Sequence, residues 1–210
     1  MTTIFAVLRR SPVLPVIVID SADSAADLGR ALLGGGIGAA EITLRSPEAL
    51  DALTAMKRAC PELMVGAGTV LTPAQARDAE QAGADFLVSP GLTRRLAEAF
   101  MDARIPALPG VGTASEAMGA REAGFKALKF FPAEANGGVA ALKALAGPLP
   151  HLSFCPTGGI TQEIAPQYLA LSSVMCVGGS WITPAKALAE RDWGEVELRA
   201  RQVAALSPRA

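Results

Sequence analysis

The chain has 210 residues, half of them hydrophobic, which gives a globular protein enough apolar side chains for one core. Its 19 Lys and Arg residues nearly balance 20 Asp and Glu residues, so charge gives no reason to expect nucleic acid or a membrane surface as a partner. No apolar stretch reaches the roughly 20 residues that cross a bilayer, and the N-terminus lacks the pattern of a secretory signal, so we expect a cytoplasmic protein.

In chain order, an amphipathic helix, a short break and an apolar strand recur several times. The breaks are small residues that suit the end of a helix, and they fall at intervals of 41 to 48 residues, at Gly36, Gly83, Gly124 and Ser172. With one further strand between successive breaks, the strands are predicted within 13–19, 34–44, 63–69, 81–90, 105–111, 122–131, 151–157 and 170–179. Helices are predicted at 1–10, 22–33, 47–59, 73–82, 92–103, 114–123, 138–146 and 192–206.

This alternation predicts an α/β fold. Strands that alternate strictly with helices favour parallel pairing through right-handed crossovers. Eight units in about 180 residues indicate a (β/α)8 TIM barrel, and we expect one such domain over residues 1–210. The helix at 1–10 would close the bottom of the barrel. The alternative is an open doubly wound sheet, but no GxGxxG turn follows the first strand.

The period of two along a strand predicts which side chains face the barrel axis. In the second strand the apolar residues must cover the helices, so Glu41 and Arg45 face inward. In the sixth strand the same rule turns Lys129 and Phe131 inward. Barrel enzymes place their chemistry where the strands end, and the third, fourth and seventh strands end at Thr69, Pro90 and Thr157.

A lysine within an apolar strand needs an explanation, because burying an ammonium group is costly unless it is paired or neutralised. One interpretation is an ion pair of Lys129 with Glu41 that only satisfies the core, although such pairs seldom stabilise a fold. The other is that burial and a nearby Arg45 favour the neutral amine, which attacks a ketone while Glu41 moves protons. His151, the only histidine, is expected in the turn before the seventh strand, at the opposite end of the barrel.

Two glycine turns, PTGGI (156–160) and VGGSW (177–181), end the last two strands. Glycine lets backbone N–H groups approach an anion, and the start of a following helix adds a partial positive charge. Loops after strands seven and eight often hold phosphate in barrel enzymes, although ordinary tight turns are the alternative. A second anion, a carboxylate, would suit the planar guanidinium of Arg45.

The three cysteines, Cys60, Cys155 and Cys176, have no CxxC or Cys/His spacing typical of a metal site. We therefore expect three buried or half-buried free thiols, as in a reducing cytoplasm.

Six motifs, AEITLRS, VGAGTVL, SPGLT, KFFPAEANGG, FCPTGGI and VGGSW, occur between residues 12 and 185. In their order and spacing the chain resembles the 2-keto-3-deoxy-6-phosphogluconate (KDPG) aldolases, class I enzymes of the Entner–Doudoroff pathway. The resemblance implies that Lys129 forms a Schiff base, that Glu41 transfers protons and that Arg45 binds the pyruvate carboxylate. It also implies substrate contacts by Thr69, Pro90 and Phe131, and phosphate contacts by Gly158, Gly159, Gly179 and Ser180.

What the resemblance implies for the reaction is cleavage of KDPG to pyruvate and D-glyceraldehyde 3-phosphate, with 4-hydroxy-2-oxoglutarate (KHG) cleavage as a side activity. It further implies a homotrimer and no metal or organic cofactor. One alternative is a 2-keto-3-deoxy-6-phosphogalactonate aldolase, which differs only in stereochemistry at C4. A phosphate-binding barrel isomerase or a thiamin phosphate synthase would need no imine-forming lysine, and a non-catalytic barrel would be expected to lack Lys129 or Glu41.

Overall fold

The computed structural model describes residues 2–206, in which helices and strands alternate along the chain. The strands are β1 (Val13–Ile17), β2 (Ala39–Thr43), β3 (Met64–Gly68), β4 (Phe86–Val88), β5 (Ala107–Leu108), β6 (Gly110–Val111), β7 (Ala127–Phe130), β8 (Ser153–Pro156) and β9 (Val177–Gly179). The helices are α1 (Ile4–Leu8), the 3-10 turn η1 (Ala22–Ser24), α2 (Ala25–Gly34), α3 (Ala49–Ala59), α4 (Pro73–Gln81), α5 (Arg94–Asp102), α6 (Ala114–Glu122), α7 (Gly138–Ala146), α8 (Ala165–Leu169), α9 (Ala185–Glu190) and α10 (Trp193–Ala204).

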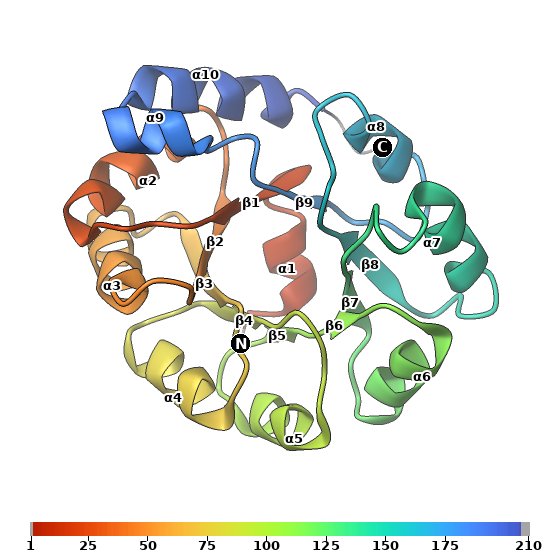
Figure 1. Cartoon of the computed structure of the whole chain (residues 1–210). Helices are drawn as coiled ribbons and strands as arrows, with labels where there is room; N and C mark the ends of the chain where they lie inside the picture. The colour runs from red at the N-terminus through yellow and green to blue at the C-terminus, as the bar shows by residue number, and fades with distance from the viewer. Residues whose placement is uncertain (1, 207–210) are drawn as a thin grey trace.

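The strands form a curled parallel sheet with most of the helices outside it, so the predicted α/β class is confirmed. A six-stranded part has the order β5-β4-β3-β2-β1-β9, and a three-stranded part has the order β6-β7-β8. All strand pairs in both parts are parallel. Figure 1 shows helices α2 to α10 around the strands, with α1 in the middle of the view. None of the helices within residues 2–206 is long and apolar enough to span a membrane.

The glycine breaks predicted from the sequence are present. Gly36, Gly83 and Gly124 follow α2, α4 and α6 with φ of 88°, 90° and 101°, in the left-handed region where glycine is favoured. Each break lets the chain turn from the end of a helix into the next strand. The strands β2, β4 and β7 follow these three breaks, so their predicted positions are confirmed.

Two features of the fold differ from the prediction. The strand predicted at 105–111 is divided at Pro109 into β5 and β6, because proline has no N–H to donate to a strand ladder. Two helices, α8 and α9, were not predicted, since helices of five and six residues are too short to show a period of 3.6.

The alternation of side chains along the strands is confirmed by the two hydrophobic clusters. Ile42, Leu128 and other residues of the same parity pack between the strands and the outer helices. A separate cluster lies among the strands on their inner side and consists of Val7, Leu8, Leu14, Ala39, Phe86, Val88, Leu108, Ala127, Cys155 and Cys176. Two residues of α1, Val7 and Leu8, belong to this inner cluster. The three cysteines are buried and free, as predicted.

Candidate active site

Lys129 on β7 and Glu41 on β2 meet on the inner side of the strands. The Lys129 Nζ lies 3.2 Å from Oε1 and 3.5 Å from Oε2 of Glu41. Their side chains are only 7% and 1% exposed. The two residues are 88 positions apart and belong to different parts of the sheet, so the alternation rule correctly placed them together.

Arg45 and Thr69 form a second pair near the same strand ends. Arg45 lies just beyond β2 in an exposed position, and its Nε donates a hydrogen bond to Thr69 Oγ1 at 3.3 Å. Thr69 directly follows β3 and has a φ of 57°, which is rare for a β-branched residue. Backbone strain of this kind clusters at ligand-binding positions. Together a guanidinium and a hydroxyl in contact offer donors that suit a carboxylate.

Phe131 lies beside the lysine, and Pro90 lies one strand farther away. The Phe131 ring centroid is 5.4 Å from Lys129 Nζ, within the range of a cation–π contact. Pro90 follows β4, and a Cβ added to Gly110 would lie only 2.3 Å from its carbonyl carbon. Gly110 is the register partner of Lys129, so Pro90 lies one strand away from the lysine.

Thr157 and the glycine turn after β8 adjoin this group. Thr157 is 6% exposed, and its Oγ1 donates to the Cys155 carbonyl at 3.3 Å. Gly158 and Gly159 have φ of 104° and 77°, so both occupy the left-handed region. A Cβ on Gly158 would meet the Phe131 ring at 3.3 Å, which places the turn against the ring that neighbours Lys129.

The second glycine turn lies at the end of β9, where Gly179 is followed by the exposed Ser180. Within residues 2–206, the amides of Gly159 and Ser180, which lie outside the strands, donate none of the backbone hydrogen bonds of the turns and loops. These donors are therefore available to an anion. Neither turn leads directly into a helix, because α8 begins at Ala165 and α9 at Ala185. The prediction that a helix start adds positive charge directly at these turns is therefore wrong. The donors for an anion are the N–H groups of the turns themselves.

Sequence reasoning missed a contact that supports the first glycine turn. Tyr168 on α8 is fully buried, and its hydroxyl donates to Oε1 of Glu134. The Glu134 amide in turn donates to the Gly158 carbonyl at 3.0 Å. Burial, and then the Glu134 carboxylate, raise the pKa of Tyr168 well above its ordinary value. Glu134 lies within the KFFPAEANGG motif, but Tyr168 lies on an unpredicted helix and gave no signal.

Two buried thiols lie near the Lys129–Glu41 pair. Cys155 is the register partner of Lys129, and its Sγ is 3.5 Å from that of Cys176. The contact with Cys155, followed by burial, raises the pKa of Cys176 well above its ordinary value. Since the thiolate is the nucleophilic form, Cys176 is a poor competitor for an electrophile beside Lys129.

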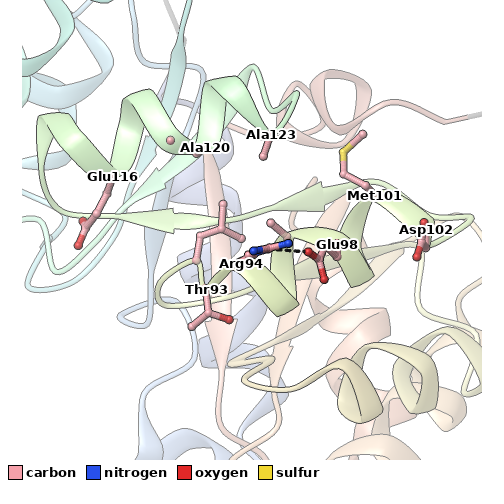
Figure 2. Close-up of a pocket in the computed structure, with 11 residues that line it drawn as sticks. Thr93, Arg94, Glu98, Met101, Asp102, Glu116, Ala120 and Ala123 are labelled. Carbon is pink, nitrogen blue, oxygen red and sulfur yellow. Dashed lines mark hydrogen bonds and ion pairs between the residues drawn. The ribbon is translucent and has the colours of Figure 1, made fainter.

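A cavity of about 780 Å³ lies elsewhere, between α5 and α6. Figure 2 shows Arg94 and Glu98 of α5 opposite Glu116 and Ala120 of α6, with Ala123 just after that helix. None of the predicted site residues lines it. No group of three or more His, Cys, Asp or Glu residues that could hold a metal occurs in the described part of the chain. His151 is exposed and precedes β8, as expected.

Comparison with known proteins gives concordant matches over nearly the whole chain. The family model for KDPG and KHG aldolases matches residues 4–198. A KHG/KDPG aldolase of Escherichia coli (strain K12) is 47% identical over 201 residues, which are 96% of this chain and 94% of that protein.

Two solved structures are also similar. The crystal structure of KDPG aldolase from Legionella pneumophila, with pyruvate captured at low pH as a covalent carbinolamine intermediate, is 45% identical with a TM-score of 0.93. That match covers 95% of this chain and 97% of the other. The KDPG aldolase of Zymomonas mobilis ZM4 with 3-phosphoglycerate is 42% identical with a TM-score of 0.92, and the match covers 96% and 95% of the two chains.

Proposed function

The chain belongs to the KDPG and KHG aldolase family, and from this premise we propose how its own residues catalyse the reaction. It is a carbon–carbon lyase of class I, which cleaves KDPG to pyruvate and D-glyceraldehyde 3-phosphate through a Schiff base and without a metal. The buried contact of Lys129 with Glu41 carries the assignment of the reacting groups. In this assignment Lys129 is the nucleophile and Glu41 is the proton shuttle.

The reaction begins when Lys129 transfers a proton to Glu41 and its amine attacks C2 of the substrate. Glu41 returns that proton to the hydroxyl of the carbinolamine, which leaves as water. The resulting protonated imine withdraws electrons from the C3–C4 bond. Glu41, directly or through a water, takes the proton from the C4 hydroxyl, and the bond breaks to release the aldehyde. Glu41 then returns the proton to C3 of the enamine, and water releases pyruvate from Lys129. The 3.2 Å contact supports one carboxylate serving these proton transfers.

Binding of the substrate is divided between two anion sites. Arg45 and Thr69 hold the carboxylate that becomes part of pyruvate, which fits their mutual contact and the strained backbone of Thr69. Pro90, Phe131 and Thr157 line the space between the two sites. The phosphate lies at the glycine turns formed by Gly158, Gly159, Gly179 and Ser180, where the amides of Gly159 and Ser180 are available as donors.

A coupled assay of pyruvate release tests the function on three substrates: KDPG, its galactonate epimer at C4, and KHG. We expect the highest kcat/KM with KDPG and a lower, measurable value with KHG. A higher kcat/KM with the galactonate epimer would assign the chain to phosphogalactonate cleavage. Absence of pyruvate from all three substrates would contradict the aldolase assignment.

We further propose that the curled sheet closes into one (β/α)8 barrel, as a single domain with α1 across its bottom. Isolated bridges of Phe154 with Val174 and of Thr157 with Gly178 support closure between β8 and β9. On the opposite side only Pro109 separates β5 from β6. Contacts of Val7 and Leu8 with the inner cluster support the place of α1.

The family resemblance supports a homotrimer, and three free thiols fit a cytoplasmic location. Light scattering during size-exclusion chromatography tests the oligomeric state. A mass near 65 kDa, three times the 21.5 kDa of the chain, is expected. A mass of one or two chains at working concentration would contradict the trimer.

A further inference from the structure

Gly68, the last residue of β3, lies beneath the Glu41 side chain. A Cβ added to Gly68 would stand 2.1 Å from Glu41 Oε1, 2.5 Å from its Cγ and 2.6 Å from its Cδ. Real Cβ atoms essentially never approach other heavy atoms within 3.0 Å. The outer half of the Glu41 side chain therefore occupies the space that any other residue at position 68 would fill.

The conformation of the backbone does not explain the glycine. Gly68 is absent from the residues with positive φ, whereas Gly158 and Gly159 are among them. Its φ is thus one that other residues adopt without strain. Position 68 must therefore lack a side chain for reasons of space, because the three heavy atoms nearest to an added Cβ all belong to Glu41.

The backbone at Gly68 has little freedom to move away from an added side chain. The Gly68 carbonyl accepts a hydrogen bond from the Leu44 amide at 2.8 Å, and Gly68 pairs in register with Thr43. The next residue is Thr69, whose strained φ of 57° already depends on its surroundings. An added Cβ would consequently displace the Glu41 carboxylate rather than β3.

We propose that Gly68 is a positioning residue for proton transfer: its missing side chain allows the Glu41 carboxylate to lie beside Lys129. This inference rests on the proposed role of Glu41. To restore ordinary contact at 3.4 Å, the carboxylate must move by about 1 Å, and a misplacement of that size lowers a rate by roughly 10²-fold.

Two assays separate proton transfer from imine formation. Exchange of the pyruvate methyl protons for deuterium, followed by NMR, requires both steps, whereas borohydride trapping of pyruvate on Lys129 requires only the imine. The Gly68→Ala variant should lose roughly 10²-fold in exchange and in KDPG cleavage, while saturating trapping still modifies one lysine per chain. Exchange at the wild-type rate in Gly68→Ala would overturn the proposal.

A matched control lies two residues earlier on the same strand. A Cβ at Gly66 would meet the Phe86 ring at 2.3 Å, so Gly66→Ala crowds a core side chain that takes no part in the reaction. It should lower the thermal midpoint but leave the ratio of exchange to trapping unchanged. An equal fall of that ratio in Gly66→Ala and Gly68→Ala would mean that crowding in β3 acts generally, which would overturn a specific role for Gly68.

A double-mutant cycle identifies the partner of Gly68. Glu41→Ala removes the three atoms nearest to an added Cβ, so Gly68→Ala should cause no further loss of exchange or thermal stability in that background. The same loss in both backgrounds would overturn the proposal. If Gly68→Ala alone does not fold, recovery of folding in the double variant supports it, and continued failure to fold overturns it.

The crystal structure of Gly68→Ala supplies a direct second measurement. The carboxylate should lie at least about 1 Å from its wild-type position, and its contact with Lys129 Nζ should be lost or lengthened. An undisplaced carboxylate would overturn the proposal. Failure of wild-type protein to trap pyruvate would instead contradict the proposed function, so the two hypotheses fail by different results.

Discussion

Replacing the buried pair tests whether Lys129 and Glu41 serve the fold or the reaction. The variants are Glu41→Gln, Lys129→Met and the double replacement. In the wild-type protein the Glu41 and Lys129 side chains are 1% and 7% exposed. Each single replacement therefore leaves the remaining partner buried without its opposite charge. Removing one partner of a buried pair lowers the free energy of unfolding by about 3–5 kcal/mol.

The double variant should behave differently from both single variants. It leaves no unpaired charge, and replacing both members of a buried pair is often neutral or stabilising by about 1–4 kcal/mol. We therefore expect its free energy of unfolding to equal or exceed that of the wild type. Activity should be lost in the double variant and in Lys129→Met, and should fall roughly 10²–10⁴-fold in Glu41→Gln.

Urea denaturation of the four proteins at neutral pH, with linear extrapolation, measures these differences. The partly buried pair of Lys57 with Asp85, at 2.7 Å, is a control away from the site. Lys57→Met should lower stability without lowering kcat/KM. A double variant of Glu41 and Lys129 that loses as much stability as the singles would refute the reasoning, because the pair would then hold the fold together.

Three further predictions concern the phosphate turns, Tyr168 and the thiols. Ser180→Asp should lower kcat/KM for KDPG by orders of magnitude. It should lower kcat/KM for KHG less and leave pyruvate trapping unchanged, and equal losses in all three assays would contradict a phosphate site. We choose Ser180 because a Cβ at Gly159 would lie 2.8 Å from Glu134 and confound the result. Since the pKa of Tyr168 is raised in the folded state, its stabilising effect should be present below pH 10 and decline as the pH rises above that value. Tyr168→Phe should lower the free energy of unfolding at neutral pH by about 1.5–3 kcal/mol and reduce the alkaline loss; unchanged urea curves at both pH values would contradict this. Burial raises the pKa of Cys60, and the contact with Cys155 raises the pKa of Cys176. A thiol reagent at pH 8 should therefore react slowly with the folded protein and modify three thiols after denaturation. Rapid modification of the folded protein would contradict that environment.

The sequence predicted the parts of the site that depend on alternation and on strand ends. Glu41 and Lys129 could be placed face to face because each lies in a strand whose apolar residues must cover helices. Pro109 was visible, but a pattern of side chains does not show that a proline divides one strand between two parts of a sheet. The helix that carries Tyr168 has only five residues, too few for a periodic signal.

Packing explains why two other roles could not be predicted. Glu134 supports a glycine turn more than 20 residues away through contacts that only the folded chain creates. Gly68 lies in a motif quoted from the sequence, yet its importance comes from the path that the Glu41 side chain takes over it. Neither relation follows from spacing along the chain.

Trapping the imine tests the central claim most directly. Borohydride added with pyruvate should inactivate the protein and attach one reduced pyruvate to each chain, seen as a single mass increment by intact-protein mass spectrometry. Peptide mapping should place the adduct at Lys129. An adduct at another lysine, such as Lys126 or Lys143, or the absence of any adduct under conditions of full KDPG cleavage, would contradict the assignment of Lys129 as the Schiff-base residue.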